Sequence, residues 1–223
     1  MCARLDTTGL LADVTYAILF GDVEAGHERA LLYRRAEGGY WMTSDLDLTW
    51  PFPHALYVEI NAGADWRVES LDVRLSGSVR RDATYRIEDS GAWRATIQTD
   101  EATVERLVPF GPETLVEFNS VWLRTLALNR LRLVPGQARD VAVVRIEMPS
   151  LEPVPAQRKY KCIGPGRVTT PAGKQDALHY VVSGRHHLWA DSRGIVVAAQ
   201  YTTNNLRYDV RRFKYRWLEQ DAD

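Results

Sequence analysis

The amino-acid sequence consists mainly of short segments in which apolar and polar residues alternate, each bounded by residues that favour turns. In residues 13–20, Val14, Tyr16 and Ile18 fall on every second position, and Gly21-Asp22 follows at once. A strand places successive side chains on opposite faces of a sheet, so this alternation predicts strands with one buried face. Similar segments recur along the chain, which is typical of an antiparallel sheet built from hairpins.

Two local features interrupt this alternation. Trp66 and Val68 are in phase with each other, whereas residues 71–75 alternate one position out of phase with them. An extra residue in one strand produces such a shift, so we expect a β-bulge near residues 69–70. The Gly-Pro-Gly sequence at residues 164–166 is expected to form a turn that ends a strand.

A helical period replaces the alternation after Gly111. Pro112 suits the first position of a helix, and Glu113 suits its first turn. Spacings of three and four residues place four apolar side chains on one helical face, namely Leu115, Phe118, Trp122 and Leu126. The sequence therefore predicts one helix over residues 112–131, after which strands resume at residue 141.

These elements favour a mostly β fold in a single domain that spans residues 1–223. Many short strands at similar spacing are typical of a large curved antiparallel sheet. We expect this sheet to form a half-barrel or a barrel, with the helix packed on its concave side. A helix in that position would cover apolar residues that the curved sheet otherwise exposes.

The charge balance and the apolar runs exclude two classes of partner. The chain has 28 Lys and Arg residues against 29 Asp and Glu, a formal net charge of −1, and no basic block. Nucleic-acid binders concentrate positive charge on one face, so no nucleic-acid partner is expected. No apolar run reaches the roughly 18 residues of a membrane helix, so no membrane span is expected.

The first residues lack the basic and apolar regions of a secretory signal, which favours a cytoplasmic location. Nothing in the sequence indicates an oligomeric state.

Motifs for common cofactor, nucleophile and metal sites are absent from the sequence. It contains no phosphate-binding loop, no dinucleotide fingerprint and no Gly-x-Ser-x-Gly elbow. It has no His-Glu-x-x-His spacing, and its two cysteines, Cys2 and Cys162, cannot form a paired-cysteine zinc site. We therefore expect no cofactor and no metal, and we interpret Cys162 as a core residue of a strand.

The second half of the chain carries a series of motifs in a characteristic order. They occupy residues 120–124 (Ser-Val-Trp-Leu-Arg), 131–136, 160–164 (Tyr-Lys-Cys-Ile-Gly), 168–173 (Val-Thr-Thr-Pro-Ala-Gly) and 188–196 (Leu-Trp-Ala-Asp-Ser-Arg-Gly-Ile-Val). In this order they resemble a broad group of uncharacterised bacterial β-rich domains. The fold of that group is similar to the half-barrel of lipoprotein-localisation factors and of putative glycolipid-binding proteins. The resemblance covers residues 108–213, implies a half-barrel, and carries over no catalytic residues.

Two histidines are expected to lie together on a hairpin formed by residues 178–190. With a turn at residues 183–185, His179 pairs with Trp189 and lies diagonally opposite His187 on the same face. Neighbouring histidines can act as a general acid and a general base, or as two metal ligands, although a zinc site needs three or four ligands. Solvated hairpin histidines are the plainer interpretation of the same pattern.

Carboxylates offer a second set of groups for proton transfer. Asp45 and Asp47 lie two residues apart, so they share one face of a strand. Paired carboxylates can divide acid and base roles between them, although a solvated strand face explains the same spacing. The candidate catalytic residues are therefore His179, His187, Tyr180 and Asp47.

Aromatic residues are abundant, with seven tryptophans and ten tyrosines. Aromatic rings bury a large apolar area and keep one polar edge, so they suit either a packed core or the lining of an apolar cavity. The candidate ligand-binding residues are Trp41, Trp50, Trp66, Trp122, Trp189 and Phe118. Arginines such as Arg81, Arg124 and Arg207 are candidates for contacting an anionic head group.

The leading hypothesis is the binding of an apolar or amphipathic small molecule, lipid-like or polyketide-like, between the sheet and the helix. The alternative is a cofactor-independent cyclase or isomerase, because proximity alone can remove ~7–11 kcal/mol of a barrier. A histidine or carboxylate in the cavity would favour the enzyme, and a wholly apolar lining would favour the binder. A protein-interaction module would instead show a flat exposed apolar patch.

Overall fold

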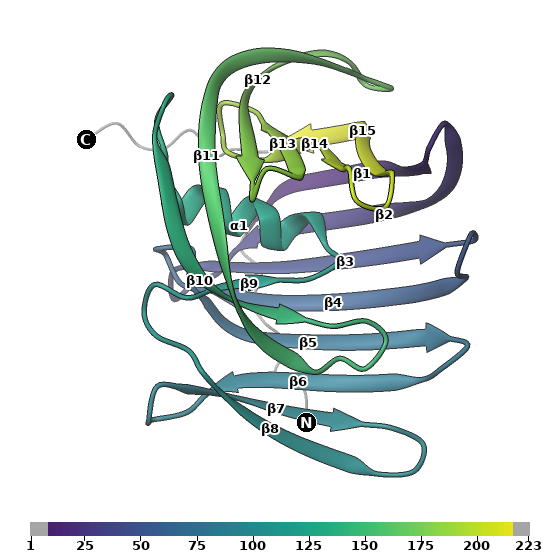
Figure 1. Ribbon diagram of the computed structural model, residues 1–223, viewed down its shortest axis with the longest axis vertical. Coiled ribbons are helices and arrows are strands. Elements are labelled where there is room, and N and C mark those ends of the chain that lie inside the picture. Colours follow the sequence, from purple (N-terminus) through teal and green to yellow (C-terminus); the bar gives the residue numbers. More distant parts are fainter. Residues whose placement is uncertain (1–8, 216–223) are drawn as a thin grey trace.

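The computed structural model describes residues 9–215, and the strands in this range form one continuous sheet around one helix (Figure 1). The sheet order is β8-β7-β6-β5-β4-β3-β2-β1-β15-β14-β13-β12-β11-β10-β9. Neighbouring strands are antiparallel except β9 and β10, which are parallel. The elements are β1 Leu10–Phe20, β2 Val23–Arg34, β3 Tyr40–Leu48, β4 His54–Ala62, β5 Val68–Gly77, β6 Arg81–Ile87, β7 Ala92–Gln98, β8 Thr103–Pro109, β9 Leu115–Glu117, α1 Val121–Leu131, β10 Ala138–Ile146, β11 Pro153–Thr170, β12 Gly173–Val182, β13 His186–Ala190, β14 Val196–Tyr201 and β15 Leu206–Tyr215.

The sheet is strongly curved and stays open. β8 and β9 are its two end strands, and no hydrogen-bonded ladder joins them within residues 9–215. In Figure 1 the strands β10, β11 and β12 arch over α1, while β3 to β6 run beneath it. The prediction of a mostly β fold with a large curved antiparallel sheet and one helix on the concave side is confirmed, in its half-barrel form.

Alternating side chains place the core on the concave face. In β4, Leu56, Val58 and Ile60 are buried, whereas the residues between them are partly exposed. Burying such aliphatic side chains stabilises the fold by about 1.5–3 kcal/mol each. The same alternation explains why the sheet has one solvated and one packed face.

The connection between β10 and β11, residues 147–152, fastens the two ends of the sheet to each other. The Tyr85 hydroxyl of β6 donates a buried hydrogen bond to the Leu151 carbonyl at 2.6 Å. The Arg81 guanidinium donates to the Ser150 carbonyl at 3.1 Å, and Arg106 of β8 pairs with Glu152 at 2.7 Å. These contacts hold the half-barrel curved although no ladder closes it.

One of the two predicted interruptions is confirmed and the other is wrong. The β4–β5 ladder pairs Asn61 with Ser70 and Ala62 with Val68, so Glu69 is the extra residue of the predicted bulge. Residues 164–166, however, do not form a turn, because β11 continues through them to Thr170. The ladder shifts register between residues 162 and 164, and Gly164 adopts a φ of 138°. A glycine bulge therefore absorbs the irregularity without ending the strand.

The helix is shorter than the sequence pattern predicts. It begins at Val121, and residues 115–117 form β9 instead, paired in parallel with β10. Ser120 caps the helix, with its hydroxyl accepting a hydrogen bond from the Trp122 amide. The apolar residues of 112–131 follow one helical period, but residues 115–117 form their backbone hydrogen bonds with β10 instead. The helix therefore begins only after the Ser120 cap.

The helix is packed on every side. Residues 121–128 are all buried. The Trp122 indole donates to the Thr43 carbonyl of β3 at 3.1 Å, and the Thr125 hydroxyl accepts from the Val196 amide of β14 at 3.2 Å. The helix thus fills the centre of the half-barrel, and the larger cavities lie beside its N-terminal end.

Substituting Gly26 with alanine should destabilise the protein by about 1–3 kcal/mol, since an added Cβ would force the backbone of β2 away from β3. That Cβ would stand 2.0 Å from the Asp47 carbonyl oxygen. Chemical denaturation measures the loss. Gly111→Ala is the matched control, because its Cβ would meet only the Thr114 hydroxyl at 3.7 Å. Equal stability of the two variants would contradict the prediction.

Candidate functional site

Two cavities lie next to each other beside the N-terminal end of α1. The first, the polar cavity, has a volume of about 820 Å³, and the second, the apolar cavity, about 550 Å³. Asn119, Met148 and Asn204 line both, so the two spaces are neighbours. Both volumes fall in the range of small-molecule sites.

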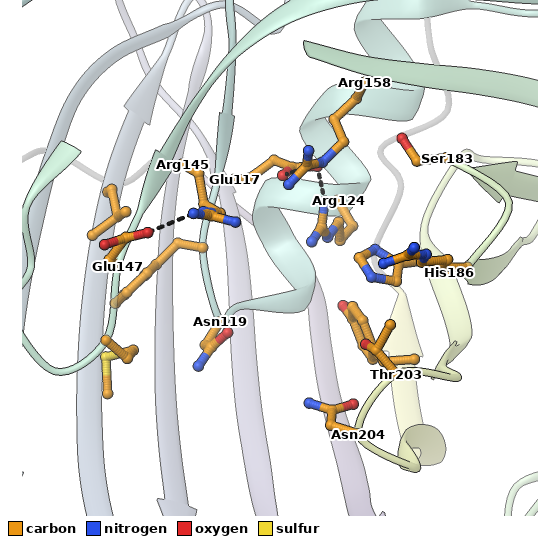
Figure 2. Close-up of a pocket in the computed structure, with 15 residues that line it drawn as sticks. Glu117, Asn119, Arg124, Arg145, Glu147, Arg158, Ser183, His186, Thr203 and Asn204 are labelled. Atoms are coloured by element: carbon orange, nitrogen blue, oxygen red, sulfur yellow. Dashed lines mark hydrogen bonds and ion pairs between the residues drawn. The ribbon is translucent and has the colours of Figure 1, made fainter. Parts of the chain in front are cut away.

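The polar cavity is lined by side chains from five parts of the fold, and four of these parts supply charged side chains. The β9–α1 junction supplies Glu117, Phe118, Asn119 and Arg124, and β10 with its following residues supplies Arg145, Ile146, Glu147 and Met148. β11 supplies Arg158, the β12–β13 hairpin supplies Ser183, Arg185 and His186, and the β14–β15 turn region supplies Tyr201, Thr203 and Asn204. Figure 2 shows Arg145 and Glu147 on one side of the space, with Arg124, Arg158 and His186 across from them.

A buried ion cluster centred on Glu117 forms the floor of this cavity. Arg124 Nη1 donates to Glu117 Oε1 at 2.6 Å, and Arg158 Nε donates to Glu117 Oε2 at 2.9 Å. Burial alone would raise the pKa of Glu117, but the charges and hydrogen bonds of Arg124 and Arg158 hold that pKa below its ordinary value. Glu117 is therefore a carboxylate that neutralises part of the charge of two arginines.

Arg124 keeps hydrogen-bonding capacity that no protein group uses. The residue is only 6% exposed, and its Nε is buried without a partner among residues 9–215. Its guanidinium carbon lies 5.7 Å from the ring centre of Tyr201. A buried donor without a partner costs about 1–3 kcal/mol, which adds to the cost of burying this guanidinium.

His186 is the histidine that reaches the polar cavity. Its ring centre lies 4.9 Å from that of Tyr201, and its buried Nδ1 has no partner among the described residues. Burial, together with the positive charge of Arg124, lowers the pKa of His186 to about 4. The imidazole is therefore neutral near neutral pH and adds no charge to the cavity.

The apolar cavity lies where the β3–β4 connection meets the ends of β1, β5 and β15. Its wall is mostly hydrocarbon, formed by Phe20, Leu48, Pro51, Phe52, Pro53, Leu75, Val79, Met148, Pro149 and Leu206. Phe52 is 78% exposed, and Trp50 packs edge-on against Phe20 with ring centres 5.1 Å apart. Exposed aromatic side chains next to an apolar hollow are the usual mark of a ligand or interaction site.

The predicted histidine pair exists but lies elsewhere. The β12–β13 register pairs His179 with Trp189 and Val181 with His187, as predicted, and His179 Nε2 lies 3.0 Å from His187 Nδ1. Burial and the neighbouring His187 lower the pKa of His179. His179, His187 and Trp189 line neither of the two cavities, because the alternation of the strands places them on the face opposite His186.

The other two candidate catalytic residues are also outside the cavities. Asp47 is exposed on β3, as is Asp45, so their common face is solvated. Tyr180 is buried in β12, and burial raises its pKa to about 12. Cys162 is buried, which confirms the interpretation of a core cysteine. Within residues 9–215, no group of three or more His, Cys, Asp or Glu side chains is placed to hold a metal ion.

Most of the candidate aromatic residues pack in the protein rather than line a large space. Trp122 is fully buried, and Trp66 stacks on Tyr40 at 3.9 Å beside a space of about 10 Å³, the size of one water molecule. Trp41 donates from its indole to Glu59 at 3.1 Å, away from both cavities. Phe118 lines the polar cavity, and Trp50 supports the wall of the apolar cavity through Phe20.

Sequence reasoning named Arg124 but missed the other three arginines of the polar cavity. Arg145, Arg158 and Arg185 come from separate strands and turns, and only the curvature of the sheet brings them together. Arg124 had a visible signal, because it interrupts an apolar helical segment that continues on both sides. Arg81 and Arg207 line neither of the two cavities.

Comparisons with known proteins find one matching family and similar solved structures. The model of a family described as "Putative glycolipid-binding" matches residues 25–204. A β-barrel-like protein of the domain of unknown function DUF1849 from Brucella abortus is 8% identical with a TM-score of 0.54, covering 95% of this chain and all of that one. A DUF1089 family protein from Pseudomonas aeruginosa is 18% identical with a TM-score of 0.47, covering 90% and 94%. No curated protein matches the chain significantly.

Proposed function

The chain belongs to the family described as "Putative glycolipid-binding", and from this premise we propose that it binds an amphipathic small molecule of glycolipid type. The polar head group occupies the polar cavity, and the hydrocarbon chain occupies the apolar cavity. The observation that carries this proposal is the contact between the two spaces, which share Asn119, Met148 and Asn204. A molecule with a polar end and an apolar end matches two adjoining cavities of those two characters.

The ligand class is the one that the sequence suggested, an apolar or amphipathic small molecule, but the proposed binding site lies elsewhere in the fold. The sequence placed the ligand between sheet and helix among tryptophans, whereas that space is filled by buried residues. The proposed site lies at the end of the helix, where strand termini and turns leave room. No helix within residues 9–215 has the length and apolar character needed to cross a bilayer.

The enzymatic alternative has less support. Its distinguishing sign was a histidine or a carboxylate in the cavity. Glu117, Glu147 and His186 line the polar cavity, and His54 lines the apolar one. Both oxygens of Glu117 are held by arginines, and the pKa of His186 lies near 4. A general acid or base works best with a pKa near the operating pH, so neither Glu117 nor His186 is suited to proton transfer at neutral pH.

Titration calorimetry with two single-chain amphiphiles below their critical micelle concentrations tests the proposal. Dodecyl glucoside and dodecyl glucuronide share the chain and the sugar ring. We expect at least one to bind with one-to-one stoichiometry, and we expect the corresponding free sugars to bind far more weakly. If neither amphiphile binds, the proposed function is wrong.

Val79→Trp should weaken the binding of the dodecyl amphiphile about tenfold or more, because the larger side chain occupies part of the apolar cavity. Displacing only two methylene groups costs about 1.6 kcal/mol. The binding of the free sugar should not change. Val134→Trp is the matched control, since Val134 is 53% exposed and lines neither cavity. If the two variants bind the amphiphile equally well, the dodecyl group does not occupy the apolar cavity.

A further inference from the structure

We infer that the head group of the bound amphiphile is anionic, so that the ligand is an acidic amphiphile rather than a neutral one. This inference rests on the proposed function and specifies the chemical class of its ligand. The shared chemistry is a carboxylate or a phosphate placed among the arginines of the polar cavity.

The charges of the polar cavity do not balance. Four arginines line it against two glutamates, Glu117 and Glu147, which leaves an excess of two positive charges. His186 does not change this count, because its pKa of about 4 keeps it neutral at neutral pH. Low-dielectric walls strengthen the field of such an excess, so the cavity attracts an anion.

The two glutamates are already occupied. Glu117 accepts from Arg124 and Arg158, and Glu147 accepts from Arg145 at the exposed rim. Among the described residues no carboxylate forms an ion pair with Arg185, which is exposed at the β12–β13 turn. Arg185 is therefore the arginine of the cavity most available to a ligand.

The hydrogen-bonding groups of the polar cavity also favour an anionic head group. Arginine side chains only donate hydrogen bonds, and four of them line the polar cavity. A neutral sugar both donates and accepts hydrogen bonds, so it would use the amides and hydroxyls of the lining as well as the arginines. A carboxylate or phosphate brings acceptors only, which matches the surplus of donors.

The test compares three amphiphiles with the same dodecyl chain. Dodecyl glucuronide and dodecyl glucoside differ by one carboxylate in place of a hydroxymethyl group, and dodecyl phosphate carries the charge without a sugar. We expect the glucuronide to bind about tenfold or more tightly than the glucoside, with a preference that weakens as salt is added. If dodecyl phosphate binds as tightly as the glucuronide, the cavity recognises the charge alone. If dodecyl phosphate binds more weakly, the cavity recognises an acidic sugar. Both results support the inference.

The arginine that mediates the preference is tested by Arg185→Gln. This exposed substitution should reduce the preference for the glucuronide to about threefold or less, and Arg185→Lys should restore part of it. Arg139→Gln is the matched control, because Arg139 pairs with Glu113 on the surface outside the cavity. Equal binding of glucoside and glucuronide by the native protein overturns the inference but leaves the proposed function in place. Failure of both sugar amphiphiles to bind overturns the proposed function and the inference with it.

Discussion

Replacing Arg124 with methionine should lower the free energy of unfolding by about 3 kcal/mol, the largest effect we expect from a single substitution at the site. Arg124 is 6% exposed and Glu117 is 2% exposed, so the change would leave a buried carboxylate with less compensation. This loss of stability lies at the lower end of the range for breaking a buried ion pair, because Arg158 still donates to Glu117 Oε2. Urea denaturation at neutral pH measures it.

Two further variants separate the loss of an ion pair from the loss of packing. Arg124→Met combined with Glu117→Gln should recover part of the lost stability, because the buried negative charge is then removed as well. Arg139→Met removes an arginine from the exposed pair with Glu113 and should cost no more than about 1 kcal/mol. If Arg124→Met is no more damaging than Arg139→Met, the buried cluster does not stabilise the fold as argued.

The sequence was informative wherever local alternation decides the structure. The hairpin of residues 178–190 shows this, since its register, including the pairing of His179 with Trp189, follows from a turn and a period of two. The bulge at Glu69 follows from a phase shift in the same way. β8, by contrast, was not predicted, because it lies at an end of the sheet and only Val108 is buried in it. An edge strand with both faces mostly in water leaves little hydrophobic alternation to read.

The candidate site was less predictable, because it is made by curvature and not by any local pattern. Glu117 and Arg158 are 41 positions apart, yet they meet because β9 and β11 both flank β10. The error in the helix had the same origin, since residues 115–117 find a partner in β10 that the sequence does not display. Tryptophans were predicted to line a cavity, but most of the large side chains in this curved sheet fill its core, as Trp122 does.

Glu28 should make the stability of the protein fall as the pH rises from about 4.5 to 7. This glutamate of β2 is fully buried, and its carboxyl accepts hydrogen bonds from the Ser44 and Ser120 hydroxyls and from the Val121 amide at the start of α1. Burial raises the pKa of Glu28 from 4.5 to about 7, although these hydrogen bonds oppose the shift. The folded state therefore binds more protons than the unfolded state within this interval, so stability is lost as the carboxyl ionises.

Glu28→Gln removes the ionisation while keeping an acceptor oxygen. Stability relative to this variant should fall by about 3 kcal/mol between pH 4.5 and the region above pH 7. Measuring the difference between native protein and variant at each pH cancels the other titrating groups. Glu24→Gln is the matched control, since Glu24 lies exposed near the start of the same strand. Parallel stability curves for the native protein and Glu28→Gln would contradict the prediction.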